Sequence, residues 1–291
     1  MPENAKPGPR LSIVVPTCRR AAALRRCLSG LADQSLPAGD LEIIVVDDSG
    51  ALSRTDDAVG IEASTGVKLI RHAENSGAGA ARNSGAKAAR ARHVAFIDDD
   101  CVAATDWAEK LLHRFALASN AAVAGSVVIS EPQRATDRVT QLLSAPEITA
   151  EGDVNRAQTA NLALPLQGFL ALGGFDERFR GAGYEDYEFC RRWRQAGRRI
   201  VPAPEAVVHH IRKTTLAGFW RQHYRYGKGA HLHYSGREGA PRPSSSSVWA
   251  RMTRAVVGGN TLVGRLQNTG LVGLSQLAML TGFTVARFTR P

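Results

Sequence analysis

HVAFIDDDCV, residues 93–102, is a short apolar run that ends in three consecutive carboxylates. The run Val94–Ile97 is typical of a buried strand, which would deliver Asp98, Asp99 and Asp100 to the edge of a sheet. Three adjacent like charges repel one another unless a cation lies among them. An isolated acidic triplet is equally typical of a polar loop, so its interpretation depends on the surrounding sequence.

The chain before the triplet alternates between apolar runs and helical patterns. Leu11–Thr17 and Leu41–Ser49 are predicted to be buried strands, and Val67–Arg71 is a short third one. Helices are predicted in 21–34, in the Ala-rich stretch 75–89 and around 107–115. This alternation predicts an open, mostly parallel α/β sheet, in which ligands bind at the carboxyl ends of the strands. Asp47 and Asp48 fall at such an end, as the triplet does.

The second half alternates less regularly. Residues 122–130 and 158–164 are predicted strands, and 136–155 is expected to be a mobile loop with a short helix. A helix is predicted from Glu185 to Ala196, with acidic residues in its first turn, where the helix dipole favours anions. Residues 198–204 and 205–213 are expected to form two short strands, the second with His209 and His210 near its end.

Composition divides the chain into three parts. Residues 1–10 are expected to be a disordered tail, 11–213 the α/β domain, and 214–291 a helical, amphipathic extension with a linker near 236–247. The run 270–288 is interrupted by polar residues and is expected to fall short of the ~20 apolar residues that span a membrane. It could lie on a membrane surface, pack on the domain, or pack on a second copy in a homodimer.

The formal net charge of +10 indicates anionic partners. No zinc-finger spacing, aromatic RNA-binding run or basic zipper is present, so phosphates or an anionic membrane are favoured over nucleic acid. The four cysteines are scattered, and the first residues, MPENAKPGPR, do not resemble a secretory signal. A cytoplasmic protein is expected, either free or peripheral at the inner face of the membrane.

The acidic residues can converge on one cleft. Asp47 and Asp48, the triplet, and the pair Glu185 and Asp186 all lie at strand ends or at a helix start. A divalent cation with a nucleoside diphosphate would neutralise such a cluster, and a separate carboxylate could act as general base. The sequence has no GxxxxGK[ST] loop, which disfavours a P-loop nucleotidase.

The ordered set LSIVVPT, IIVVDDS, NSGAGAARNSGA, AFIDDD, ANLAL with GGFDERF, and GYEDYEFCRRWRQAG resembles the family 2 glycosyltransferases of the GT-A fold. The resemblance covers roughly residues 11–213. An acidic triplet alone is a weak signal, whereas six motifs in order are specific. The resemblance implies the GT-A fold, with a central sheet flanked by helices, and inverting transfer from a nucleoside-diphosphate sugar.

The resemblance also implies which residues bind the donor. Pro16 and Thr17 would close the first strand over the nucleotide. Asp48 would bind the nucleobase, with Asp47 as the less favoured alternative. The remaining donor contacts would come from turns and from the helix beside the phosphates; they are Arg19, Asn75, Gly77, Arg82, Asn83, Asp98 and Asp99.

Metal binding and catalysis follow from the same resemblance. Asp98 and Asp100 would form the acidic pair that holds Mg²⁺ or Mn²⁺, with Asp99 able to share either role, and His210 would complete the site. His209 would point the other way because side chains alternate along a strand. Asp186 would be the catalytic base, with Glu185 beside it.

The donor is expected to be a UDP-, GDP- or dTDP-sugar, and the acceptor a lipid, saccharide, natural product or peptide. Two alternatives remain. A sugar-phosphate nucleotidyltransferase would need a Gly-rich basic loop after the first strand, and PTCRRAAALRR contains no glycine. A catalytically silent nucleotide-sugar-binding subunit would not need both Asp100 and Asp186.

Overall fold

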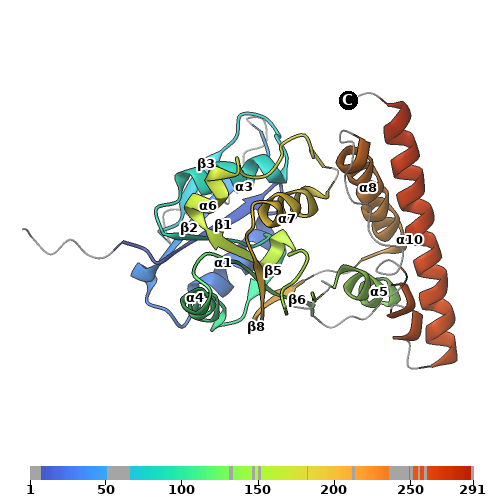
Figure 1. The fold of residues 1–291 in the computed structure, drawn as a ribbon, viewed down its shortest axis with the longest axis horizontal. Helices are drawn as coiled ribbons and strands as arrows, with labels where there is room; N and C mark the ends of the chain where they lie inside the picture. The colour runs from blue at the N-terminus through green and yellow to red at the C-terminus, as the bar shows by residue number, and fades with distance from the viewer. Residues whose placement is uncertain are drawn as a thin grey trace, which may run out of the picture.

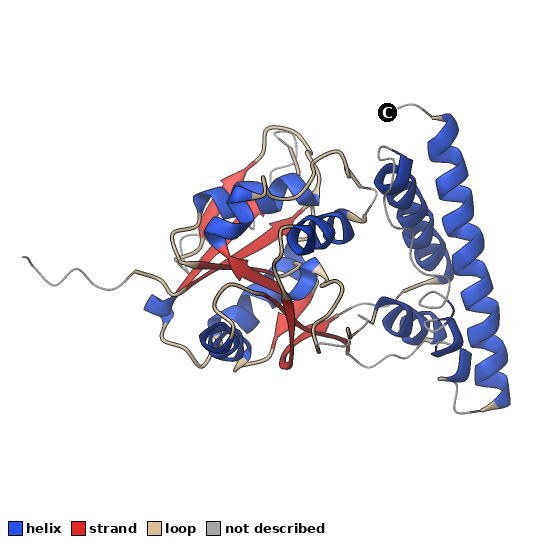
Figure 2. Cartoon of the chain, in the orientation of Figure 1, coloured by secondary structure: helices blue, strands red, loops and turns tan. Residues whose placement is uncertain are grey.

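The computed structural model describes residues 8–50, 66–130, 134–145, 148–149, 152–181, 183–211, 214–235, 249, 252–254, 256–258 and 261–289. One eight-stranded sheet organises this part of the chain, in the order β3-β2-β1-β4-β7-β6-β8-β5. Helices cover both of its faces, and two long C-terminal helices stand to one side (Figures 1 and 2).

The first half of the sheet is parallel. β1 (Leu11–Thr17) lies between β2 (Leu41–Asp47) and β4 (His93–Phe96), and β3 (Lys68–Arg71) extends the sheet beyond β2. Every residue of β1 is buried, as expected for a parallel strand covered on both faces. The parallel register brings the ends of β1, β2 and β4 to one edge of the sheet.

The second half of the sheet is mixed. β7 (Leu162–Pro165) pairs antiparallel with both β4 and β6 (Ala122–Ile129). β8 (Ile200–His210) runs parallel to β6, and β5 (Cys101–Ala103) closes the edge antiparallel to β8. The strand predicted at 158–164 begins only at Leu162 in the structure, because residues 159–161 form a short 3₁₀ turn.

The prediction of two short strands in 198–213 was wrong, because β8 runs unbroken from Ile200 to His210. The pairing register with β6 shifts between Gly125, opposite Ala203, and Ser126, opposite Val207. This irregularity leaves three residues of β8 unmatched, among them Pro204, which cannot donate to a ladder. Pro204, which in the sequence suggests the end of a strand, thus lies inside one continuous strand.

Two apolar layers hold the helices on the sheet. On one face, α1 (Ala21–Ala32) and α4 (Trp107–Leu117) bury Leu24, Leu31 and Trp107. On the other face, α3 (Ala78–Ala88), α6 (Leu166–Ala171) and α7 (Glu185–Gln195) bury Phe169, Phe189 and Trp193. α7 begins at the predicted Glu185, after Tyr184 in the left-handed region (φ 78°).

Two C-terminal helices pack with a helix from the middle of the chain. α5 (Ala135–Ser144), α8 (Leu216–Ser235) and α10 (Leu262–Phe288) share a small core that includes Val139, Phe219 and Leu271. α8 and α10 lie side by side (Figure 1) and approach closely at two glycines. A Cβ on Gly227 would collide with the backbone of Met279, and a Cβ on Gly282 with that of Tyr224.

Three expectations concern the tail, the linker and the C-terminal run. Arg10 is ordered, because its amide donates to Asp40 O (2.8 Å) and its guanidinium pairs with the Asp40 carboxylate (3.1 Å). Residues 1–7 and the expected linker 236–247 lie outside the described residues. The apolar run near 270–288 belongs to a 27-residue helix, the one in the described part of the chain that is long and apolar enough to cross a membrane.

Candidate active site

Asp99, the middle carboxylate of the triplet, points into the protein. It is fully buried, and Thr17 Oγ1 donates to its Oδ2 (2.7 Å) while Arg20 lies 2.6 Å from its Oδ1. Burial raises the pKa of Asp99 to about 6, although Arg20 and Thr17 favour the charged form. Asp99 therefore braces the β4–β5 loop against the end of β1 and does not line a cavity.

Asp98 turns toward α7 through a buried arginine. Arg82 of α3 donates to Asp98 Oδ1 (2.6 Å) and to Glu185 Oε1 (3.1 Å), and only 4% of its side chain is exposed. This bridge joins the acidic loop to the first turn of α7, 87 positions later in the chain. It also neutralises Glu185, so that the neighbouring Asp186 is the less engaged of the two carboxylates.

Asp100 faces His210. His210 Nε2 lies 3.1 Å from Asp100 Oδ1, because Cys101 of β5 pairs with His210 of β8. Within the described residues, Asp100, His210 and Cys101 bring their ligand atoms within 4.8 Å of one another. Burial raises the pKa of the Cys101 thiol well above its usual range, which disfavours a thiolate ligand.

The Asp100–His210 pair fits a divalent cation. One carboxylate and one imidazole, both partly exposed at the cavity wall, are a donor set that Mn²⁺ accepts, and the remaining positions would be open to phosphate and water. Each predicted acidic ligand has a guanidinium partner: Arg82 pairs with Asp98 Oδ1 (2.6 Å) and Arg20 with Asp100 Oδ2 (2.8 Å). Asp100 differs in that its other oxygen, Oδ1, faces His210. His209 is the neighbour that pairs with Val102 and lines neither cavity of the site.

Asp48 organises the turn before α3. Its carboxylate accepts the amides of Ser76 and Gly77 (2.8 Å each) and contacts His72 Nδ1 (2.8 Å). A carboxylate offers about four lone-pair positions, so this arrangement leaves about one for a ligand. Gly77 adopts φ 92°, a left-handed conformation that a side chain would strain.

Three predicted donor residues make hydrogen bonds within the protein. Asn83 clamps the Gly173–Gly174 turn, since its amide donates to Phe175 O (2.9 Å) and its carbonyl accepts Phe175 N (2.8 Å). Asp47 Oδ1 caps the amide of Ser49 (3.0 Å). The Arg19 amide donates to Ser49 Oγ (3.0 Å). None of these three lines the cavities described next.

A cavity of about 600 Å³ opens at the ends of β1, β2 and β4. Predicted donor residues meet there from segments far apart in the chain: Pro16, Thr17, Asp48, Asn75, Gly77, Arg82 and Asp98. Arg20 lines the same cavity, in place of the predicted Arg19. We refer to this space as the donor cavity.

Asp186 lines a second cavity of about 700 Å³, which we call the acceptor cavity. Burial, and then the charge of Glu185, raise the pKa of Asp186 to about 7, while Arg156 opposes the shift. Its carboxylate accepts the amide of Tyr187 (2.8 Å), and no cation in the described part of the chain lies within ion-pair distance of it. The two cavities share eight residues: Arg20, Arg82, Asp98, Gly183, Glu185, Gln222, Arg225 and Tyr226.

Helix α8 supplies residues that sequence reasoning did not assign. Arg221 lines the donor cavity, and Gln222, Arg225 and Tyr226 line both cavities. The spacing of 221, 222, 225 and 226 was the available signal, because residues four apart lie on one face of a helix. What the sequence does not reveal is that this face meets the sheet edge.

The family model described as "Glycosyl transferase family 2" matches residues 12–168, and "Glycosyl transferase family group 2" matches 93–286. A pre-mycofactocin glycosyltransferase of Mycobacterium tuberculosis is 29% identical over 96% of this chain and 58% of its own length. A validoxylamine A glucosyltransferase of Streptomyces hygroscopicus is 31% identical over 74% of this chain and 60% of its own length. The chain thus spans less than two thirds of these relatives.

Solved structures show the same fold. The mannosyltransferase PcManGT of Pyrobaculum calidifontis, in complex with GDP-Man and Mn²⁺, aligns with a TM-score of 0.62 at 19% identity, covering 97% of this chain and 86% of its own. Residues 1–349 of S. aureus TarS, in complex with UDP, align with a TM-score of 0.56 at 16% identity, covering 96% and 90%. With its GT-A fold and a family match over more than half of its 291 residues, the chain belongs to glycosyl transferase family 2.

Proposed function

We propose that the protein transfers a sugar from a nucleoside-diphosphate sugar to an acceptor hydroxyl, with inversion and with the help of a divalent metal. The observation that carries this proposal is Asp186, a carboxylate with a raised pKa that lines the acceptor cavity next to Glu185, which lines both cavities. A carboxylate with a pKa of about 7 is well matched to accept a proton near neutral pH.

The chemistry assigned to Asp186 is general base catalysis. Its carboxylate takes the proton of the acceptor hydroxyl as that oxygen attacks the anomeric carbon of the donor. The bond from this carbon to the diphosphate oxygen breaks on the opposite face, so the configuration inverts and the nucleoside diphosphate leaves with the bonding electrons. Glu185, held by Arg82 at 3.1 Å, supports the position of the first turn of α7.

The leaving diphosphate would be met by cations of the donor cavity. Arg20, Arg221 and Arg225 line it from α8 and from the segment before α1. Fixed guanidinium groups stabilise charge that develops on phosphate oxygens. Asp100 and His210 would hold Mg²⁺ or Mn²⁺, which when bound supplies further neutralisation of that charge.

Relatives support the substrate classes. PcManGT was solved with GDP-Man and Mn²⁺ and TarS with UDP, which favours a nucleotide-sugar donor and a divalent metal here. Two relatives are named for pre-mycofactocin and validoxylamine A. The acceptor cavity, at about 700 Å³, has a volume typical of small-molecule sites, and we propose a small-molecule acceptor.

A thermal-shift screen tests the donor proposal. UDP, GDP and dTDP, and their sugars, are added with and without Mn²⁺. At a hundred times its Kd, the true ligand stabilises the fold by about 2.7 kcal/mol. His210→Ala should remove the Mn²⁺-dependent part of the shift, whereas the neighbouring His209→Ala should retain it. A silent binding subunit would show the shift without transferring sugar, and no shift with any nucleotide would refute the proposal.

A further inference from the structure

Helix α10 has an apolar face that no described residue covers. Leu262, Leu266, Leu277 and Leu280 are 55–76% exposed, and Phe288 is 78% exposed. At 100° per residue these positions fall on one side of the helix, together with Gly270 and Gly273. Figure 1 shows α10 at the edge of the molecule, with α8 between it and the sheet. We refer to these residues as the outer face of α10.

The opposite side of α10 is buried against the protein. Leu271, Val272, Ser275, Ala278 and Gly282 pack there, against α8 and α5. The polar Asn268 and Ser275 thus lie inside, while the outer face carries leucines. The exposed side of a helix at the surface of a water-soluble domain is expected to be polar instead.

Most of the net charge of the protein lies in the sequence segment that contains this helix. Residues 214–291 contain ten Lys and Arg and one acid, Glu238, so they hold +9 of the formal +10. The helix itself has no acidic residue, and Arg265 and Arg287 lie near its two ends. An apolar helical face flanked by cations complements the acyl chains and anionic headgroups of a bilayer.

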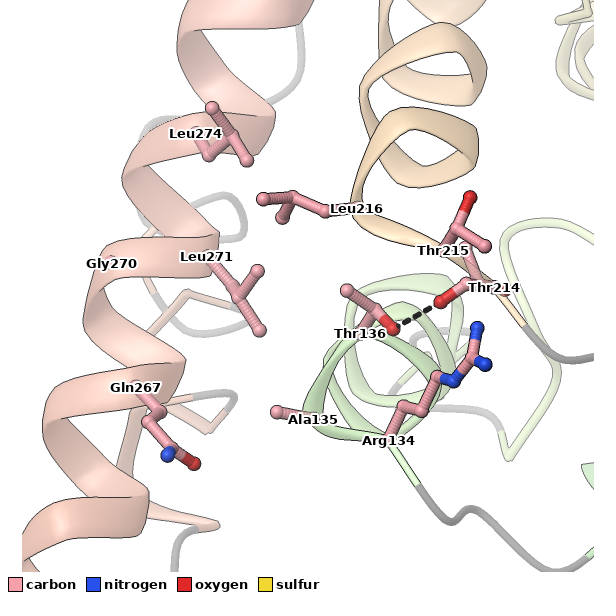
Figure 3. A pocket seen from close by; sticks show the side chains of 10 residues that line it. All are labelled: Arg134, Ala135, Thr136, Thr214, Thr215, Leu216, Gln267, Gly270, Leu271 and Leu274. Atoms are coloured by element: carbon pink, nitrogen blue, oxygen red, sulfur yellow. Dashed lines mark hydrogen bonds between the residues drawn. The ribbon is translucent and has the colours of Figure 1, made fainter.

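A groove continues the outer face toward α5 and α8 (Figure 3). It measures about 630 Å³; Leu216, Leu271 and Leu274 point into it, and Arg134 lines it from the start of α5. Gly270 belongs to both the groove and the outer face, which makes the apolar surface continuous. A groove with leucine walls and a cation beside it suits an amphiphile with an acyl chain and an anionic headgroup.

We propose that the outer face of α10 docks on an anionic lipid bilayer, with the helix lying in the interface. A spanning orientation does not fit the structure, because α8 packs along α10 and its Arg221 and Arg225 would enter hydrocarbon. The inner side of the same helix contributes Gln276, Met279 and Phe283 to the acceptor cavity. One side of α10 would therefore contact lipid while the other side lines the acceptor cavity. The proposed docking does not depend on the proposed reaction.

Vesicle co-sedimentation of the full chain tests this docking. One set of vesicles is phosphatidylcholine, and the other is phosphatidylcholine mixed with phosphatidylglycerol. The wild type should bind the anionic vesicles, less so at high salt, and bind the neutral ones weakly. The double variant Leu277→Glu/Leu280→Glu should bind the anionic vesicles at least about tenfold more weakly, because it places two carboxylates on the docking face.

Leu117→Glu is the matched control. Leu117 is also an exposed leucine (66%), but it lies at the end of α4, a helix that packs on the central sheet and not on α10. It should bind vesicles like the wild type. Circular dichroism melts should show both variants folded. The proposal is overturned if the double variant binds as the wild type does, if charge on the lipid makes no difference, or if neither vesicle is bound. A dimer in light scattering that the double variant dissociates would also overturn it, in favour of a second copy of the chain.

Discussion

Arg82→Met tests the bridge that joins the acidic loop to α7. The substitution keeps most of the buried volume but removes two charge-assisted hydrogen bonds, to Asp98 (2.6 Å) and to Glu185 (3.1 Å). Both carboxylates would then lie without their cation beside Asp186. Because Arg82 favours the charged form of Asp186, its loss should also raise the pKa of that carboxyl further.

The structure sets the size of the effect. Breaking a buried ion pair by removing one partner costs roughly 3–5 kcal/mol. The side chains of Asp98 and Glu185 are 29% and 14% exposed, so water would solvate part of the orphaned charge. We therefore expect a loss of about 2–3 kcal/mol, which for a domain of this size lowers Tm by roughly 5–10 °C.

Urea unfolding followed by circular dichroism measures this loss. Arg178→Met is the matched control, because Arg178 also pairs with an aspartate but is 68% exposed. It should change the free energy of unfolding by no more than about 0.5 kcal/mol. In Arg82→Met/Glu185→Gln, part of the lost stability should return, since one unpaired charge is gone. If Arg82→Met were as stable as Arg178→Met, the bridge would have no structural importance.

Three further predictions concern pH, helix packing and the donor cavity. Asp186 must be ionised to accept a proton, so kcat/KM should rise with pH up to about 7 and level off above that pH. A flat profile from about pH 5 to 8 would exclude Asp186 as the base. Gly282→Ala should destabilise the fold by about 1–3 kcal/mol in thermal melts, because its Cβ would collide with the backbone of α8. Gly273→Ala should stabilise the fold by about 0.5–1 kcal/mol, because its Cβ would meet no other atom. The reverse order of stabilities would contradict the packing of α8 on α10. Arg225→Ala should weaken nucleoside-diphosphate binding about tenfold or more by calorimetry, whereas Lys228→Ala on the same helix should not; equal effects would indicate general charge attraction.

The sheet edge and the first turn of α7 could be predicted because their signals are local. An apolar run that ends in carboxylates places them at a strand end, and Glu185 begins its helix where the sequence indicates. Alternation along one strand predicted that His209 and His210 face opposite ways, and the resemblance selected His210; of the two, His210 lines the acceptor cavity.

The directions of individual side chains could not be predicted, because they depend on contacts between distant segments. Asp99 is buried by Thr17, 82 positions earlier, and Asn83 is engaged by Phe175, 92 positions later. In the same way, α8 reaches the donor cavity only through tertiary packing. A pattern of residue types identifies a polar turn or an amphipathic helix, but its partner is chosen by the fold as a whole.

The central claim is that Asp186 is the base of a sugar transfer. Its most direct test is Asp186→Asn, assayed for transfer with the donor found by thermal shift and for binding of the same donor. The amide preserves the shape but cannot accept the proton, so transfer should fall by roughly 10²–10⁴-fold while the donor Kd changes little. Transfer at the wild-type rate by a folded, donor-binding Asp186→Asn protein would contradict the account.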